Sequence, residues 1–84
     1  MTERIVLDET FTIHDLGQRV HSFRDAVRSC YEMVIDGTRV REIDTAALQM
    51  LVAIKKECIE QGRQWVFTPS DAMKTLQSVV GIEL

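Results

Sequence analysis

The stretch Glu42-Ile43-Asp44-Thr45-Ala46-Ala47-Leu48 decides the fold, because it carries the chain from a loop into its best-defined helix. From Thr45 to Gln61 apolar residues recur at three- and four-residue steps, which places them on one face of a helix. That face comprises Ala47, Leu48, Leu51, Val52, Ile54, Cys58 and Ile59. The pattern predicts a helix over residues 45–61 that packs on a sheet.

Two apolar segments flank this helix, and both have the composition of a β-strand. Residues 31–36 precede the helix, and residues 64–68 follow it after Gly62, a typical residue for a helix end. A strand, a helix and a second strand in this order form a βαβ unit with parallel strands. Such units place functional groups on the loop that leaves the carboxyl end of the first strand, and Asp44 and Thr45 end that loop.

The amino-terminal third predicts a strand pair and a helix. Residues 4–7 are apolar, and residues 8–12 break this pattern before Ile13 and His14. We expect two short strands joined by a turn at Asp8-Glu9, which form an antiparallel edge of the sheet. The next helix is capped by Thr12 or by Asp15, the latter forming a capping box with Gln18. Its predicted buried face consists of Leu16, Val20, Phe23, Val27 and Cys30.

The carboxyl-terminal third predicts one more helix. The segment Thr68-Pro69-Ser70-Asp71 is a typical helix start, and Gly81 ends the helix. Residues 82–84 form either a last edge strand or a trailing tail. The chain is therefore predicted to be a single α/β domain over residues 1–84, a small mixed sheet of about four strands with three or more helices packed on it. With so few strands, we expect one sheet face to be left open for a partner.

Composition narrows the function classes. The 84 residues are 45% hydrophobic and 27% charged with a net charge of −3, which gives no general attraction to nucleic acid. No apolar run approaches the roughly 20 residues of a membrane span, and no signal peptide is visible. We expect a cytoplasmic protein without direct membrane insertion. Cys30 and Cys58 are expected to be buried, reduced thiols and not metal ligands or a disulfide.

Asp44 and Thr45 have two interpretations. Either residue is a good N-cap, and from spacing alone capping is the simpler interpretation. Capping needs only one of them, however, and if Asp44 caps, the Thr45 hydroxyl turns to solvent at the positive end of the helix. A phosphoryl group there would leave the fold intact and add a charge of about −1.5 to −2 beside Asp44 and Glu42. That charge would repel a partner docked over the helix start.

The order of these elements and the residues at their junctions resemble the STAS domain, the fold of anti-sigma-factor antagonists and of the cytoplasmic tails of sulfate transporters. The resemblance is carried by Val34-Ile35-Asp36, Ile43-Asp44-Thr45-Ala46-Ala47-Leu48, Glu60-Gln61-Gly62, Thr68-Pro69-Ser70 and Val80-Gly81-Ile82. Phe11-Thr12-Ile13 before an amphipathic helix also looks like the family's amino-terminal segment. The resemblance therefore covers nearly the whole chain.

The resemblance implies a non-catalytic regulatory module that binds a protein partner and needs no cofactor or metal. Thr45 matches the Ser or Thr that a partner kinase phosphorylates in anti-sigma-factor antagonists. The partner-binding residues that it implies are Asp44, Thr45, Ala46, Leu48 and Gln49. The partner would be an anti-sigma factor with serine kinase activity, which would make the chain a regulator of transcription.

The sequence departs from the common STAS pattern, and the departures support an alternative. Thr45 replaces the commoner Ser, Ala46 stands where a second Ser is frequent, and Ala47 replaces a Gly. The Asp-Thr-Ala pattern is similar to STAS proteins of phospholipid-transport complexes and chemotaxis gene clusters. The alternative is therefore an unphosphorylated subunit of a transporter or signalling complex. Nucleotide binding, suggested for the family, lacks a phosphate-binding loop here, and the oligomeric state is left open.

Several other polar groups have simple interpretations. His14 and His21 lie two helical turns apart, about 10 Å along the axis, which is too far for both to bind one metal ion. Arg39 and Arg41 either hold a phosphate or are solvated or paired with Glu42.

Gln49 and Met50 could both be exposed groups that contact a partner. The alternative is that Met50 is part of the core. Trp65 is packed in an interior strand or, at an edge, anchors an interface. No His stands near a nucleophile at a recognisable spacing, and no Gly-rich loop is present that could hold phosphates. We therefore expect no enzyme activity of the chain itself.

Overall fold

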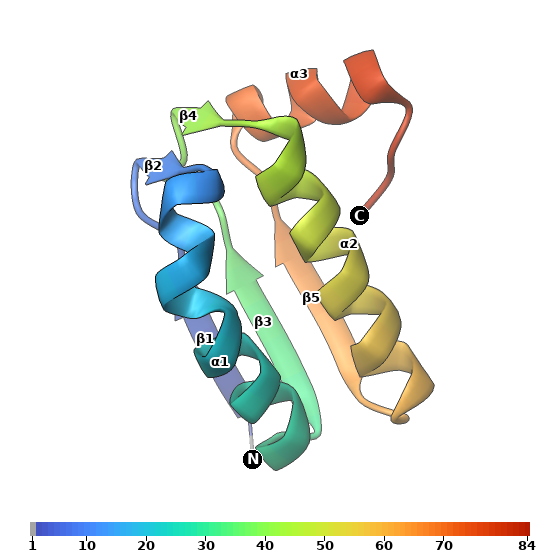
Figure 1. Cartoon of the computed structure of the whole chain (residues 1–84). Coiled ribbons are helices and arrows are strands. Elements are labelled where there is room, and N and C mark those ends of the chain that lie inside the picture. Colours follow the sequence, from blue (N-terminus) through green and yellow to red (C-terminus); the bar gives the residue numbers. More distant parts are fainter. Residues whose placement is uncertain (1) are drawn as a thin grey trace.

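Three parallel strands form the main sheet, in the order β1-β3-β5. They are β1 (Thr2–Val6), β3 (Glu32–Asp36) and β5 (Gln64–Thr68). The structure is a computed structural model that describes residues 2–84, except for the side chains of residues 13 and 16–20 (Figure 1). The α/β class is confirmed, but this sheet is parallel throughout and not mixed.

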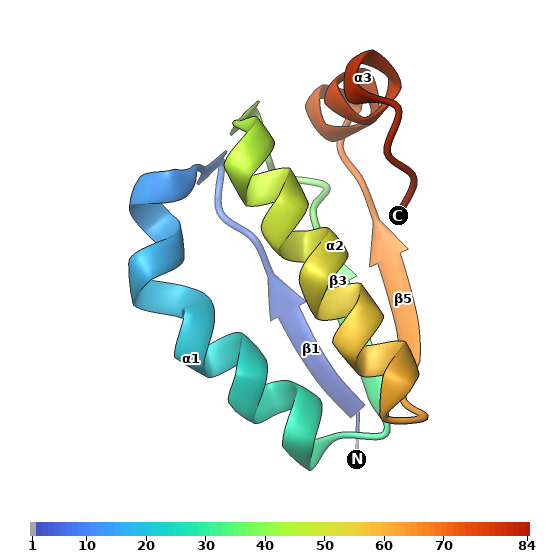
Figure 2. The same ribbon diagram turned by 45° about the vertical axis from the view of Figure 1, so that its right-hand side comes forward.

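Two helices cover one face of the sheet. The chain runs β1–α1–β3–α2–β5, so both crossovers step along the sheet in the same direction. Because such crossovers are right-handed, α1 (Ile13–Ser29) and α2 (Thr45–Glu60) must lie on the same face, as Figures 1 and 2 show. The third helix, α3 (Asp71–Val80), lies beyond the carboxyl ends of the strands. Among residues 2–84, no helix covers the opposite face of the sheet, which is open as predicted (Figures 1 and 2).

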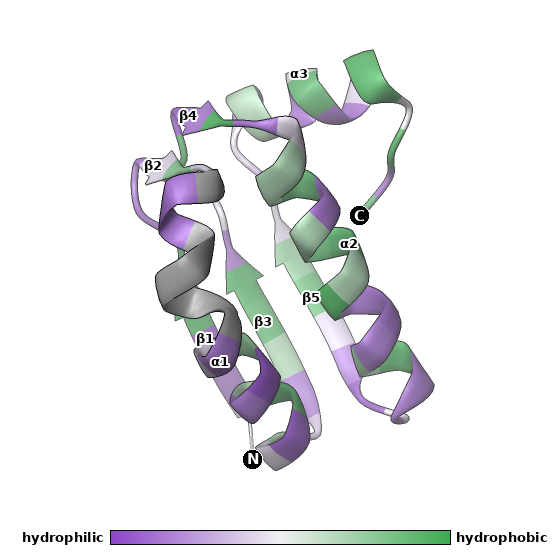
Figure 3. Ribbon diagram, viewed as in Figure 1, coloured by the Kyte–Doolittle hydropathy of each residue, from purple (hydrophilic) through white to green (hydrophobic). Residues whose placement is uncertain are grey.

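Side chains alternate between the two faces of the sheet. Ile5, Ile35 and Phe67 pair in register and face the helices, whereas the next row, Arg4, Val34 and Val66, lies on the open face. Figure 3 shows that the middle of β3 is hydrophobic, whereas β5 changes from hydrophilic at its start to hydrophobic further along. The buried core contains Leu7, Phe11, Phe23, Val27, Cys30, Met33, Ile35, Val40, Ala47, Leu51, Ile54, Cys58 and Met73.

The predicted helix ends are confirmed. α2 ends one residue earlier than expected, and Gly62 follows with φ of 73°, a left-handed conformation that glycine adopts without strain. Ser70 caps α3, since its Oγ accepts a hydrogen bond from the Met73 N–H at 3.2 Å. Gly81 ends α3 with φ of 72°. These helix boundaries are therefore determined by local interactions of the cap residues and of the two glycines.

The predicted antiparallel strand pair at the amino terminus is wrong. β1 pairs with β3, and the following short strand β2 (Thr10–Phe11) pairs in parallel with β4 (Glu42–Ile43), which was not predicted. Burial explains the difference. Phe11 is buried and packs edge-on against Phe23 with ring centroids 6.4 Å apart, so the chain continues past the end of β1 and does not fold back along it.

The start of α1 also differs in detail from the prediction. Thr12 is the N-cap, and the Asp15 carboxylate accepts a hydrogen bond from the Thr12 N–H at 2.9 Å. Thr12, one of the two predicted caps, therefore forms the capping pair with Asp15, and the side chain of Gln18, the predicted partner of Asp15, lies outside the described residues. Phe23, Val27 and Cys30 are buried as predicted. Leu16 and Val20, also assigned to the buried face, lie outside the described side chains.

Residues 82–84 form no strand. Instead the tail returns to α2, where Lys55 Nζ donates a hydrogen bond to the Leu84 backbone oxygen at 3.0 Å and Leu84 packs against the core. β5 therefore stays at the edge of the sheet. Trp65, which the sequence placed in an interior strand, lies on this edge strand and is partly buried beside Phe67.

Cys30 and Cys58 are free and buried, as predicted. Burial raises the pKa of the Cys58 thiol, and the nearby Cys30 raises it further. Since the thiolate is the reactive form, we expect both thiols to react with a soluble disulfide reagent at least about 100-fold more slowly in the native protein than in denaturant. Stopped-flow thiol titration measures this ratio, and fast reaction of the folded chain would contradict the burial.

Candidate functional site

The site lies at the carboxyl ends of the strands, where all three helices begin (Figure 1). Gly37 joins the elements there: its N–H donates to the Thr68 carbonyl at 2.8 Å, and its carbonyl accepts from the Val40 N–H at 3.0 Å. A Cβ atom added at Gly37 would lie 2.5 Å from the sulfur of buried Met73. The end of β3 thus packs directly under α3, which fixes the loop that leads to Thr45.

Asp36, the last residue of β3, organises the start of this loop. Its Oδ1 accepts hydrogen bonds from the Thr38 hydroxyl at 2.6 Å and from the Thr38 N–H at 3.0 Å. Arg4 forms an ion pair with its other oxygen at 2.9 Å. The Thr38 hydrogen bonds, with help from Arg4, lower the pKa of Asp36.

This lowered pKa predicts a pH dependence of stability. Because the folded pKa lies below the ordinary aspartate value of about 3.9, the contribution of Asp36 is fully present above about pH 4. The contribution is lost as the pH falls through the lower, folded pKa. Asp36→Asn should therefore be less stable than the wild type near neutral pH, and the difference should shrink in acid. Urea unfolding at several pH values measures it, and a gap that widens in acid would contradict the assignment.

The β2–β4 pair brings the starts of α1 and α2 together. Thr10 pairs with Glu42, and Phe11 pairs with Ile43, so the capping residues of both helices come next. The Glu9 carbonyl reinforces this pair by accepting from the Arg41 N–H at 2.7 Å and the Glu42 N–H at 3.0 Å. A shallow hollow results, lined by Thr10, Thr12, His14, Asp15, Glu42, Ile43 and Asp44.

Asp44 is the N-cap of α2. Its Oδ1 accepts a hydrogen bond from the Ala47 N–H at 2.8 Å, which satisfies one of the backbone donors left open at a helix start. Thr45 is then the first helical residue, and its side chain is exposed. Within the described part of the chain, no hydrogen bond is found for the Thr45 hydroxyl. A visiting protein or enzyme can therefore reach it.

The other predicted partner-binding residues divide into two groups. Ala46 is half-buried and Gln49 is exposed one turn after Thr45, so both belong to the surface. Leu48 requires a correction: its side chain is fully buried, with 0% exposure. The helical period places Leu48 on the same inner stripe as Leu51, so it supports the helix start from beneath and is not offered to a partner. Met50 packs against the core, as its simpler interpretation held.

The surface around Thr45 carries charges of both signs. The acidic residues Glu42 and Asp44 directly precede Thr45 in the chain. The basic residues Arg39 and Arg41 are exposed on the segment before them. Of the alternatives for the two arginines, a salt bridge to Glu42 is not found among the residues that the structure describes. We define the Thr45 surface as Glu42, Asp44, Thr45, Ala46 and Gln49.

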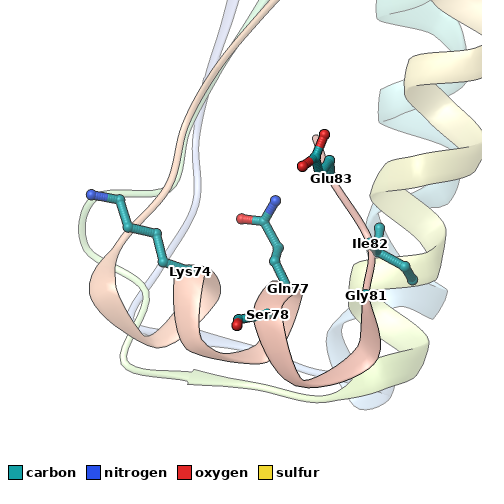
Figure 4. Close-up of a pocket in the computed structure, with 6 residues that line it drawn as sticks. All are labelled: Lys74, Gln77, Ser78, Gly81, Ile82 and Glu83. Atoms are coloured by element: carbon teal, nitrogen blue, oxygen red, sulfur yellow. The ribbon is translucent and has the colours of Figure 1, made fainter.

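Other features of the molecule add no second site of this kind. His14 and His21 are exposed, and the described residues contain no group of three or more His, Cys, Asp or Glu placed to bind a metal ion. Figure 4 shows a hollow between α3 and the tail, lined by Lys74, Gln77, Ser78, Gly81, Ile82 and Glu83, which holds none of the predicted site residues. None of the described helices is long and apolar enough to cross a membrane.

Sequence reasoning missed the contribution of α1 to this surface. Thr12 and His14 line the same hollow as Asp44 because β2 pairs with β4. Each of these strands has two residues, too few for alternation to be recognised in a sequence. The one available signal was Phe11, an isolated large apolar residue just before a helix cap.

Fold and site together define a small parallel α/β module whose distinctive polar groups lie on an exposed surface at a helix start. A family model of the STAS domain matches residues 5–81, and the chain belongs to the STAS domain family. STAS domains are generally non-catalytic and commonly mediate protein–protein interaction, in regulatory or transport-associated settings. No curated protein matches the chain in sequence.

Proposed function

We propose that this STAS domain is a non-catalytic regulatory module that docks onto a protein partner through the Thr45 surface, in the manner of an anti-sigma-factor antagonist. One observation carries the proposal: Asp44 caps α2 by itself, which leaves the neighbouring Thr45 hydroxyl exposed at the helix start. A residue that capping does not require is thereby available for recognition. Exposed groups positioned by a rigid scaffold are typical of binding sites.

Phosphorylation of Thr45 is the switch that this geometry supports. The first turn of α2 carries partial positive charge, so a phosphoryl group there stabilises the helix by about 0.3 to 1 kcal/mol and leaves the fold intact. The same group adds a charge of about −1.5 to −2 next to Asp44 and Glu42. The change therefore falls on the partner-facing surface, where like charge and desolvation oppose docking.

A second candidate is a subunit of a phospholipid transporter or of a chemotaxis or other signalling complex that uses the same surface without phosphorylation. Ala47 favours this candidate, since it is fully buried where the common STAS pattern has a glycine. A methyl group there fills the space beneath the helix start, which suits a fixed interface. Both candidate functions place the partner over Thr45, and they differ only in whether Thr45 is phosphorylated.

Site-specific photo-cross-linking tests the docking surface. A photoreactive amino acid replaces Gln49, one turn after Thr45, and the matched control replaces Arg24, an exposed residue about three turns along α1. In the native host, we expect the position 49 probe to cross-link one defined partner and the position 24 probe to do so weakly or not at all. Cross-linking of that partner only from position 24 would overturn the proposal.

Intact-mass measurement separates the two candidates. The chain purified from its native host under varied growth conditions is expected to show a fraction with one added phosphoryl group, located by fragmentation on Thr45. Replacement of Thr45 by Val should remove that fraction and leave the fold unchanged. Persistent absence of the phosphoryl group would reject the switch and leave the unphosphorylated subunit.

A further inference from the structure

The free edge of β5 offers backbone groups for pairing. The Gln64 N–H donates to the Tyr31 carbonyl at 2.9 Å, and the Thr68 carbonyl accepts from the Gly37 N–H at 2.8 Å. Gln64 and Thr68 thus face β3, and because the direction alternates along a strand, the N–H and C=O groups of Trp65 and Phe67 point to the free edge. No strand pairs with this edge in the described residues, since the tail returns to α2.

The two edges of the sheet are protected differently. β1 carries Glu3 and Arg4 within the strand, and charges of this kind discourage pairing with another chain. β5 contains no charged residue and no proline, and its three central residues are Trp65, Val66 and Phe67. An uncharged apolar edge strand is a ready template for a further strand. Of the two edges, β5 is therefore the one that the sequence leaves open to a partner.

The sequence of β5 is complementary to itself when it is reversed. The five residues are polar, aromatic, Val, aromatic and polar, so a two-fold axis at Val66 aligns each residue with one of its own kind. We propose that a second copy of this chain pairs antiparallel with β5 across this axis. Two three-stranded sheets then become one continuous six-stranded sheet.

The geometry of this pairing is consistent with the directions of the backbone groups. Trp65 and Phe67 of the second copy form a hydrogen-bonded pair, and the two-fold axis repeats it with the roles exchanged. Each such pair also places two aromatic rings opposite each other on the helix-covered face. Val66 meets Val66 of the second copy in a non-hydrogen-bonded pair, where side chains lie closest.

The flank of α2 next to this edge suits the same partner. Val52 and Ile59 line a hollow beside the tail, and Ile59 remains 56% exposed. Lys55, Lys56, Glu60 and Glu83 also line it, so the charges there are of both signs. A patch of this kind can face its own copy without net repulsion, which favours a second copy over a strongly charged partner.

This interface goes beyond the proposed function and uses other residues. Antiparallel pairing directs the carboxyl ends of the strands in the two copies away from each other. Both Thr45 surfaces therefore remain accessible, at opposite ends of the dimer. A failure of this inference would leave docking through Thr45 unaffected.

Sedimentation velocity over a wide concentration range tests the proposal. We expect the purified wild-type chain to form a dimer, and Val66→Lys to raise the dimer dissociation constant at least about tenfold, because two like charges then lie opposite each other. The matched control is Val6→Lys on the β1 edge, since Val6 is 41% exposed and Val66 is 44% exposed. Dissociation by both variants alike, or a wild type that is monomeric throughout, would overturn the proposal.

Two further variants make the test specific for a two-fold contact at Val66. A mixture of Val66→Lys and Val66→Glu should recover a one-to-one heterodimer, while each variant alone dissociates. Under mild oxidation Val66→Cys should form a disulfide-linked dimer, because the Cα atoms of such a pair lie about 4.5 Å apart, within disulfide range. The native cysteines are buried, and Val6→Cys is the matched control. Equal cross-linking of the two cysteine variants would contradict the two-fold pairing.

Discussion

Replacing Thr45 by Glu is expected to weaken partner binding at least about tenfold while the fold and its stability stay nearly unchanged. The side chain is exposed at the first position of α2, so the new carboxylate causes no burial cost. The partial positive charge of the helix start tolerates it. The partner, in contrast, meets a third negative group beside Glu42 and Asp44. Titration calorimetry with the co-purified partner measures the affinity, and circular dichroism checks the fold.

Two controls separate charge at the site from charge in general. Thr45→Ser keeps the hydroxyl and should bind like the wild type. Ser22→Glu adds the same charge at an exposed residue in the middle of α1, more than two turns after the helix start. Unchanged affinity of Thr45→Glu would move the interface elsewhere, and an equal loss for Ser22→Glu would reduce the effect to net charge.

Replacing Leu48 by Ala is expected to lower the free energy of unfolding by about 2 to 5 kcal/mol. The Leu48 side chain is fully buried, so its truncation removes apolar contacts and leaves a cavity beneath the start of α2. Small domains are stable by only about 5 to 15 kcal/mol, so this loss removes a large share of the total free energy of unfolding. Equilibrium urea denaturation measures the change.

Gln49→Ala is the matched control for this prediction. Gln49 is the exposed neighbour of Leu48, and its truncation should change the free energy of unfolding by less than about 0.5 kcal/mol while affecting partner binding. The two variants thus distinguish a residue that stabilises the start of α2 from a residue that contacts the partner. If Leu48→Ala kept its stability but lost binding, Leu48 would be a contact residue after all.

Much of the fold was predictable because its signals are local. The single apolar stripe on α2, the caps at Asp44 and Ser70, and the glycines at 62 and 81 act within a few residues of themselves. Such signals give the helices and their ends. The parallel pair around α2 then follows from chain order and handedness.

The pairing of the first two strands was not predictable in the same way. A turn between two short apolar segments resembles a hairpin, and only the burial of Phe11 against Phe23 shows that the second segment lies elsewhere. The pairing partner of β2 is distant in sequence. The open edge of β5 likewise depended on whether residues 82–84 would form a strand, which three residues cannot indicate.

The site was predictable in its chemistry and less so in its surroundings. The sequence located Asp44 and Thr45 but left open which of them caps the helix, and the structure shows that Asp44 caps and Thr45 is exposed. Leu48 belongs both to the sequence motif of the predicted binding site and to the apolar face of α2. The structure shows that its side chain is buried with that apolar face. That Thr12 and His14 lie beside Asp44 could not be predicted from the sequence, because it depends on the pairing of β2 with β4.

Hydrogen–deuterium exchange of the chain, with and without its co-purified partner, tests the central claim most directly. The amides of Thr45 and Ala46 have no intrahelical acceptor and exchange fast in the free chain, so they report sensitively on a docked partner. We predict that the partner slows exchange over residues 42–49. Unchanged exchange over those residues, with protection on the open sheet face instead, would contradict the account.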